Sequence, residues 1–216
     1  MPLEKHIDHT LLKPVATPKA IKQLCAEALE YNFYAVCVNS CYVALAREEL
    51  KDSGVKIAAV VGFPLGAMST EAKVCEANYC IEQGADEIDM VMNLGWLKFE
   101  EFGLIKEEIA LIKQTIGSRK LKVIIETCYL TAEEKKIASM LVIDGKADFV
   151  KTSTGFGSGG ATFEDIELIS RVIQNKVKIK ASGGIKDRKT AMRYLDMGVS
   201  RLGTSSGITI VKETNP

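Results

Sequence analysis

The chain has 216 residues, of which 28 are basic and 28 are acidic, so its formal net charge is zero. This length suits one α/β domain with a large buried core. The balanced charge argues against a nucleic-acid partner. No apolar run reaches the length of about 18 residues that a membrane-spanning helix requires, so a membrane partner is not expected either. We therefore expect a single soluble domain over residues 1–216.

The N-terminus and the cysteines both indicate a reducing compartment. Residues 1–12 include Glu4 and Asp8 and lack the apolar core of a signal peptide, so a cytoplasmic location is expected. The six cysteines form no Cys-x-x-Cys pair and lie mostly in apolar segments. We therefore expect buried reduced thiols rather than disulfides or a zinc site.

Strand-like and helix-like segments alternate along the chain. In order, they are an extended segment at 7–9, a helix at 17–29, a strand at 33–38, a helix at 41–52, a strand at 55–61, a helix at 70–83, a strand at 87–92, a helix at 99–116, a strand at 121–127, a helix at 131–144, a strand at 149–152, a helix at 163–174, a strand at 177–181, a helix at 187–197 and a strand at 201–203. Several helical stretches are followed by a glycine, which favours a left-handed C-terminal cap. These glycines are Gly84, Gly117, Gly145 and Gly198.

Eight strand and helix units in one chain favour a closed parallel (β/α)8 TIM barrel. The alternative is an open, doubly wound sheet, but no Gly-x-Gly-x-x-Gly turn follows an early strand. Both folds place their chemistry at the carboxyl ends of the strands.

Two lysines, Lys151 and Lys180, stand at the ends of apolar strands that are otherwise typical of strands buried on both faces. Burial of an ammonium group costs free energy, so a lysine at such a position indicates a function. Neighbouring strands lie about 4.8 Å apart, and two ammonium groups about 5 Å apart would repel by roughly 3 kcal/mol at an effective dielectric constant of about 20. The pKa of one of the two lysines would then fall from about 10.4 towards 8. A useful fraction of that lysine would be free amine, which can attack a carbonyl carbon and form a Schiff base.

Strand alternation predicts which side chains point into the barrel. In the run Glu-Ile-Asp-Met-Val-Met at 87–92, the isoleucine and the methionines share the face that packs on helices, and Asp89 points inward. The same alternation turns Lys151 inward. An isolated aspartate or lysine is usually a solvated surface group, but the combination of Asp89, Lys151 and Lys180 beside polar loops favours a functional site at the barrel mouth.

Glycine-rich and hydroxyl-rich loops follow the last three strands, at 155–161, 183–184 and 203–207. Barrel enzymes often bind a phosphate in this region through backbone N–H groups at the start of a short helix. One glycine cluster alone is more often a plain turn, but three on one rim favour a phosphate site.

Several segments together resemble the deoxyribose-phosphate aldolase family, over residues from about 5 to 210. They are Ile-Asp-His-Thr-Leu-Leu at 7–12, Asp-Met-Val-Met-Asn at 89–93, Phe-Val-Lys-Thr-Ser-Thr-Gly at 149–155, Lys-Ala-Ser-Gly-Gly-Ile at 180–185 and Gly-Thr-Ser-Ser at 203–206. The resemblance implies a class I aldolase of deoxyribonucleoside catabolism that uses neither a metal nor another cofactor. Such an enzyme reversibly cleaves 2-deoxy-D-ribose 5-phosphate to D-glyceraldehyde 3-phosphate and acetaldehyde, and forms a homodimer or a higher homo-oligomer.

The resemblance also assigns roles to residues. Lys151 matches the lysine that forms the Schiff base, Lys180 the second lysine that favours its free amine, and Asp89 the carboxylate that handles protons with a bound water. The implied substrate-binding residues are Asp8, Thr10, Cys37, Thr152, Gly155, Gly183, Gly184, Lys186, Gly203, Ser205 and Ser206. For Cys37, an inert buried thiol is the alternative interpretation.

The chain departs from the pattern of some family members at three places. Phe156 stands where they have a basic residue, Lys186 stands where some have an arginine, and the chain ends without their terminal tyrosine. Phosphate binding would then depend more on the backbone and on Lys186. His6, Asp8 and His9 do not predict a metal site, because they lie too close along an extended segment to share one inward face.

Two other functions stay open at the level of sequence. A phosphosugar isomerase on the same fold would share the phosphate rim but would use a carboxylate or a thiol as its base, without paired lysines. A catalytically silent sugar-phosphate-binding protein would bind its ligand without turnover.

Overall fold

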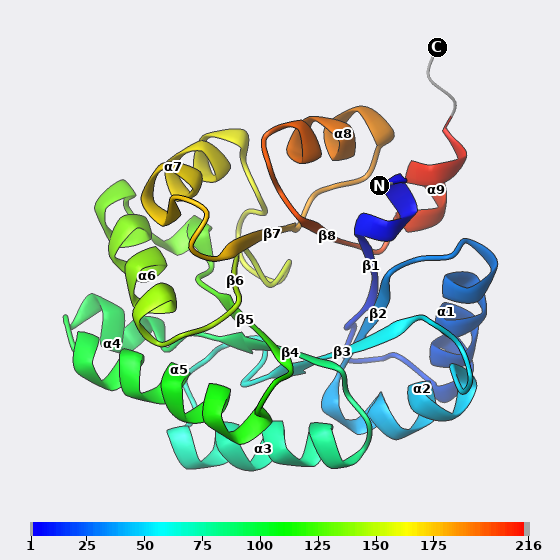
Figure 1. Ribbon diagram of the computed structural model, residues 1–216, viewed down its shortest axis with the longest axis horizontal. Helices are drawn as coiled ribbons and strands as arrows, with labels where there is room; N and C mark the ends of the chain where they lie inside the picture. Colours follow the sequence, from blue (N-terminus) through cyan, green and yellow to red (C-terminus); the bar gives the residue numbers. More distant parts are fainter. Residues whose placement is uncertain (1, 214–216) are drawn as a thin grey trace.

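The computed structural model describes residues 2–213. Eight parallel strands, hydrogen-bonded in sequence order, close into a barrel that a ring of helices surrounds (Figure 1). The strands are β1 (Ile7–Leu11), β2 (Ala35–Val38), β3 (Lys56–Val61), β4 (Glu87–Val91), β5 (Lys120–Ile124), β6 (Phe149–Lys151), β7 (Lys178–Ser182) and β8 (Arg201–Thr204). The predicted TIM barrel is confirmed, and the alternative of an open sheet is wrong.

The helices follow the strands in the predicted alternation. They are α1 (Pro18–Glu30), α2 (Val43–Glu49), α3 (Thr70–Glu82), α4 (Leu94–Lys98), α5 (Phe102–Ile116), α6 (Ala132–Asp144), α7 (Phe163–Ile173), α8 (Arg188–Asp196) and α9 (Gly207–Lys212), with 3-10 turns at Leu3–His6, Ser40–Tyr42 and Thr127–Tyr129. The sequence did not predict the short helices α4 and α9, and the predicted helix 99–116 begins later, at Phe102. Residue 1 and residues 214–216, which include the chain end without tyrosine, lie outside the described residues.

Hydroxyl and carboxylate side chains cap the first turn of several helices. Thr17 accepts a hydrogen bond from the Ala20 backbone N–H at the start of α1. At the start of α6, Thr131 and Glu134 each accept a hydrogen bond from the backbone N–H of the other, which forms a capping box. Such caps satisfy N–H groups that the first helical turn leaves without a partner.

Three of the four predicted glycine caps are confirmed. Gly84, Gly117 and Gly198 have φ values of 101°, 61° and 90°. The prediction for Gly145 is wrong, because the left-handed residue after α6 is Lys146, at φ 62°. Gly145 is explained by packing instead, since a Cβ built there would lie 2.5 Å from Cγ2 of Ile109 on α5.

The apolar core lies mainly between the strands and the helices. Ile88, Met90 and Met92 are buried in it, as the alternation of β4 predicts. Inside the barrel, by contrast, a small apolar cluster that includes Cys37 and Val60 lies beside buried charged side chains. The barrel interior therefore carries polar chemistry, while the helix-facing layer provides most of the apolar burial.

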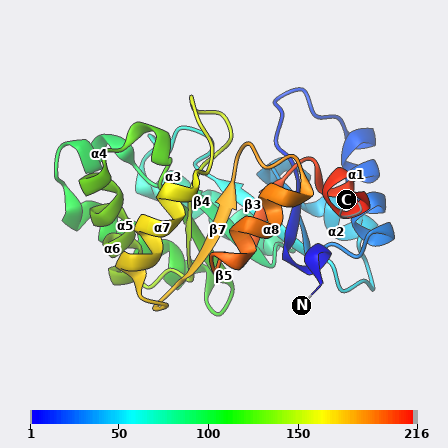
Figure 2. The same cartoon turned by 90° about the horizontal axis from the view of Figure 1, so that it is seen from above.

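The loops that follow the strands gather at one end of the barrel. Figure 2 shows the loop after β6, in yellow, and the loop after β1, in dark blue, projecting from the same end of the molecule. Within residues 2–213, no helix is both long enough and apolar enough to cross a membrane.

Candidate active site

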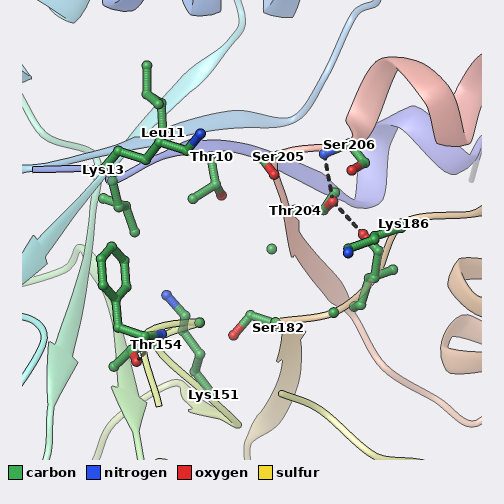
Figure 3. Close-up of a pocket in the computed structure, with 17 residues that line it drawn as sticks. Thr10, Leu11, Lys13, Lys151, Thr154, Ser182, Lys186, Thr204, Ser205 and Ser206 are labelled. Carbon is green, nitrogen blue, oxygen red and sulfur yellow. Dashed lines mark hydrogen bonds between the residues drawn. The ribbon is translucent and has the colours of Figure 1, made fainter. Parts of the chain in front are cut away.

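A cavity of about 390 Å³ opens at the carboxyl ends of β1, β6, β7 and β8 (Figure 3). Most of the predicted site residues line it, namely Thr10, Lys151, Gly155, Gly183, Gly184, Lys186, Gly203, Ser205 and Ser206. The structure therefore brings together loops that are distant in the sequence, as expected for the carboxyl end of a parallel barrel.

The charge of the cavity lining is entirely positive. Three lysines, Lys13, Lys151 and Lys186, line the cavity, and among the residues described no acidic side chain does. Sequence analysis missed Lys13, which follows the matched segment 7–12 directly. The lining suits a ligand that carries negative charge.

Lys151 and Lys180 are direct neighbours, as predicted. The pairing of β6 with β7 places Lys151 opposite Lys180. Both Nζ atoms lie 2.8 Å from the same oxygen, Oδ2 of Asp89, to which both donate hydrogen bonds. Twice this distance is therefore the upper limit of the separation between the two nitrogen atoms, and a carboxylate bridges the two cations.

The electrostatics of this cluster keep Asp89 and Lys180 ionised. Burial opposes the charge on Asp89, but Lys122, Lys151 and Lys180 together hold the pKa of its carboxyl well below the ordinary value. Burial likewise opposes the charge on Lys180, yet the carboxylates of Asp8 and Asp89 raise the pKa of Lys180 above that of an ordinary lysine. Lys180 is therefore a permanent cation at neutral pH, and Asp89 a permanent anion.

Of the three residues predicted to be catalytic, only Lys151 lines the cavity. The side chain of Lys151 is 3% exposed, whereas those of Asp89 and Lys180 are fully buried beneath it. The amine of Lys151 is therefore the group of this cluster that a ligand in the cavity reaches first.

Three predicted substrate-binding residues do not line the cavity. Asp8 is fully buried and forms ion pairs with Lys180 and Arg201. The Thr152 hydroxyl donates a hydrogen bond to the Ser182 carbonyl oxygen, 3.2 Å away, and accepts one from the Ser182 N–H, so it joins β6 to β7. Cys37 is buried with its Sγ 3.9 Å from Oδ2 of Asp89, and burial raises the pKa of its thiol, as expected for the inert alternative.

The six cysteines are all free, but they are not all buried. Cys25, Cys37 and Cys80 are buried, Cys128 is partly buried, and Cys41 and Cys75 are exposed. The prediction of burial is therefore wrong for Cys41, in the 3-10 turn Ser40–Tyr42, and for Cys75, whose side chain is on the solvent-facing side of α3.

Three further charged residues beneath the cavity were missed by sequence analysis. Lys122 on β5 lies 2.6 Å from Asp89 and 2.6 Å from Glu87, and Arg201 pairs with both Asp8 and Glu87. Strand alternation carried part of this signal, because Glu87 shares a face with Asp89. Lys122 is directly opposite Asp89 in the strand pairing, but that register was not available from the sequence.

Glu126 is another functional candidate that the sequence did not reveal. It follows β5 in a left-handed conformation, at φ 48° and ψ 68°, and is 3% exposed. Its carboxylate accepts hydrogen bonds from the Thr154 N–H, at 3.1 and 3.2 Å, and from the Thr154 hydroxyl. Burial raises the pKa of Glu126 above the ordinary value. Glu126 thus anchors the loop that follows Lys151, and Thr154 in this loop lines the cavity.

The rim loops hold backbone conformations that suit close approach of a ligand. Gly183 and Gly184 have φ values of 85° and 80°, which L side chains rarely adopt. On the neighbouring loop, the Thr204 hydroxyl accepts a hydrogen bond from the Ser206 N–H at 2.9 Å and donates one to the Ile185 carbonyl oxygen at 2.7 Å (Figure 3). The bond to Ile185 ties the loop after β7 to the end of β8.

The two histidines near the N-terminus point to different partners. Nδ1 of His6 lies 3.0 Å from the Ser200 carbonyl oxygen, and Nε2 of His9 lies 2.7 Å from Oε2 of Glu27. Within residues 2–213, no group of three or more histidine, cysteine, aspartate or glutamate side chains is placed to hold a metal ion.

Comparisons with known proteins agree with this geometry. Residues 4–212 match the DeoC/LacD family of aldolases. The chain is 50% identical to a deoxyribose-phosphate aldolase of Coprothermobacter proteolyticus, over 99% of this chain and 97% of that protein, and 52% identical to one of Thermotoga maritima, over 95% and 83%. The structure superposes with a TM-score of 0.95 on a putative deoxyribose-phosphate aldolase from Coccidioides immitis, at 40% identity, covering 97% of this chain and 84% of that one. The chain therefore belongs to the DeoC/LacD family and is an aldolase.

Proposed function

We propose that this protein cleaves 2-deoxy-D-ribose 5-phosphate reversibly to D-glyceraldehyde 3-phosphate and acetaldehyde, through a Schiff base on Lys151. The observation that carries this assignment is the position of the Lys151 amine at the floor of a cationic cavity, hydrogen-bonded to Asp89 and flanked by Lys180. The relatives at about half identity bear the name of this activity. A phosphate on the glycine-rich rim would leave the aldehyde end of the sugar to reach Lys151.

The reaction follows from imine chemistry. The free amine of Lys151 attacks the aldehyde carbon C1, and loss of water gives a protonated imine. The bond between C2 and C3 then breaks as a base removes the proton of the C3 hydroxyl, which releases D-glyceraldehyde 3-phosphate. The electron pair of the broken bond enters the imine and gives an enamine, which is protonated at C2 and hydrolysed to acetaldehyde and the free lysine.

In this scheme Asp89 acts mainly through its charge. A carboxylate whose pKa lies far below the ordinary value accepts a proton poorly, so Asp89 is a weak general base by itself. It is well placed to orient the Lys151 amine and to stabilise the positive imine that forms there. We propose that proton transfer runs through a water molecule held by this carboxylate.

Reductive trapping tests the assignment of Lys151. Borohydride added with acetaldehyde is expected to leave one ethyl group on the protein, located at Lys151 by peptide mass spectrometry. A matched control is Lys106→Met, which removes an exposed lysine on α5 and should leave labelling unchanged. An unlabelled protein, or a label that survives in Lys151→Met at another lysine, contradicts the assignment. Turnover of deoxyribose 5-phosphate in an assay for glyceraldehyde 3-phosphate separates the aldolase from a silent binding protein.

The cationic rim makes a separate prediction about the phosphate. Replacing Lys13 or Lys186 by methionine should raise KM for deoxyribose 5-phosphate by about tenfold each, because a charge-assisted hydrogen bond contributes roughly 1.5–3 kcal/mol. Activity on unphosphorylated 2-deoxyribose should stay nearly constant, since that substrate lacks the anion. Steady-state kinetics with both sugars make the comparison. An equal loss of activity on both sugars would show that these lysines do not bind the phosphate.

We also propose a cytoplasmic homo-oligomer, at least a dimer. The free state of all six cysteines suits a reducing compartment. A solved relative from Aeropyrum pernix, 29% identical with a TM-score of 0.89, is described as a tetramer. Light scattering of the purified protein measures the oligomeric state directly.

A further inference from the structure

The buried charges beneath Lys151 form a closed ring. Going around it, Arg201 pairs with Asp8 at 2.7 Å, Asp8 with Lys180, Lys180 with Asp89 at 2.8 Å, Asp89 with Lys122 at 2.6 Å, Lys122 with Glu87 at 2.6 Å, and Glu87 with Arg201 at 3.2 Å. The members come from β1, β4, β5, β7 and β8. Their side chains are at most 7% exposed, so water screens them little.

The ring is balanced in charge. It alternates three carboxylates with three cations, and each member contacts two members of the opposite sign. Lys151 is attached to it from above, through one contact with Asp89. Within residues 2–213, Lys151 forms one ion pair, whereas each cation of the ring forms two.

Two titratable groups outside the ring also lie near Lys151. Cys37 on β2 is a buried thiol whose pKa burial raises, so it stays neutral. Glu126, after β5, is directed to the backbone N–H and hydroxyl of Thr154 and forms no ion pair within residues 2–213. Its carboxylate is still near enough to Lys151 for the two groups to attract each other. The carboxylate that pairs directly with Lys151 is that of Asp89 on β4, a ring member that Lys122 and Lys180 also contact.

We propose that Arg201 and Glu87 are positioning residues, which close this ring and so set the charge that surrounds the Lys151 amine from beneath the cavity. This inference rests on the proposed function of Lys151, but it assigns roles to two residues remote from the cavity. Without Arg201, the carboxylates would outnumber the ring cations, and a protonated Lys151 would restore neutrality. Without Glu87, the cations would be in excess, and Lys151 would lose its proton more easily.

Arg201 and Glu87 also have structural contacts, which the test must separate from their charge. The Arg201 guanidinium lies 3.4 Å from the centre of the Tyr34 ring, and the Tyr34 hydroxyl lies 3.4 Å from Oε1 of Glu87. Methionine at position 201 keeps a long side chain over the aromatic ring of Tyr34, and glutamine at position 87 keeps the shape of the carboxylate. If Arg201 and Glu87 had a purely structural role, each variant would lose stability, but the pH profiles of kcat/KM of the two variants would not shift in opposite directions.

The test compares Arg201→Met, Glu87→Gln and the double variant with the unmutated enzyme. The readouts are the acid limb of the pH profile of kcat/KM and the pH dependence of borohydride trapping with acetaldehyde. Arg201→Met should move both to higher pH, with a loss of about tenfold in rate on the acid limb, and Glu87→Gln should move both to lower pH. The double variant is balanced again and should return towards the unmutated profile, as should Arg201→Lys.

Each outcome has a distinct meaning. Shifts of both single variants in the same direction, or a double variant that stays as shifted as Arg201→Met, would overturn the role of the ring. If Arg201→Met does not fold, the direction of the Glu87→Gln shift and the unmoved profile expected of Arg201→Lys still decide. A label on Lys151 with unmoved pH profiles would reject the ring alone, whereas an unmutated enzyme that takes no label at Lys151 would reject the proposed function itself.

Discussion

Replacing Lys151 by methionine is expected to lower kcat for deoxyribose 5-phosphate cleavage by about 10⁴-fold or more. The substitution removes the nitrogen that forms the covalent intermediate, and no other lysine that lines the cavity among the described residues contacts Asp89. The phosphate rim stays intact, so binding of the phosphosugar should persist. Steady-state kinetics measure the loss, and isothermal titration with the uncleaved sugar measures the binding.

Lys151→Arg is the informative companion to this variant. Arginine keeps a positive charge beside Asp89 and so preserves the ion pair, but its guanidinium is not nucleophilic at neutral pH. The arginine variant should therefore be as inactive as the methionine variant. Residual turnover above about one per cent in either variant, after correction for contaminating enzyme, would mean that another residue carries the chemistry.

The order of strands and helices was predictable from the sequence because each element leaves a periodic signal. Alternation within β4 separated Asp89 from Ile88 and Met90, and the structure confirms this separation. The short helices α4 and α9 left no such signal, since five or six residues span little more than one turn. The error at Gly145 has a different origin: contact with Ile109 on another helix, rather than local backbone conformation, requires the glycine there.

The adjacency of Lys151 and Lys180 was also predictable, because parallel strands that follow each other in a barrel are neighbours. The simple expectation of two repelling ammonium groups was incomplete, however. Asp89 bridges the two lysines, and Lys180 has a second carboxylate, that of Asp8. Ion pairs that join β1, β4 and β8 depend on strand register across the barrel, which one sequence does not specify. For that reason, Arg201 and Glu87 emerged only from the three-dimensional arrangement.

Asp8→Asn is expected to destabilise the protein by about 3–5 kcal/mol at neutral pH. Asp8 is fully buried between Lys180 and Arg201, and removal of one partner from a buried ion pair leaves the other charges uncompensated. Denaturation by urea, followed by circular dichroism, measures the loss. Asp52→Asn is the matched control, because Asp52 is exposed, and it should change the free energy of unfolding by no more than about 0.5 kcal/mol.

The same residue predicts how stability depends on acidity. Burial opposes its charge, but Lys180 and Arg201 lower the pKa of Asp8 from 3.8 to about 2. Because the folded protein binds this proton less readily than the unfolded chain does, Asp8 contributes about 2 kcal/mol above pH 5, and this contribution is lost as pH falls towards 2. In Asp8→Asn this pH-dependent contribution should be absent. The free energies of unfolding of the variant and of the unmutated protein, plotted against pH, should therefore converge as pH falls. Parallel curves from pH 6 to pH 2 would mean that Asp8 is not held as a carboxylate by its two cations, and the charge balance inferred beneath Lys151 would lose one of its three anions.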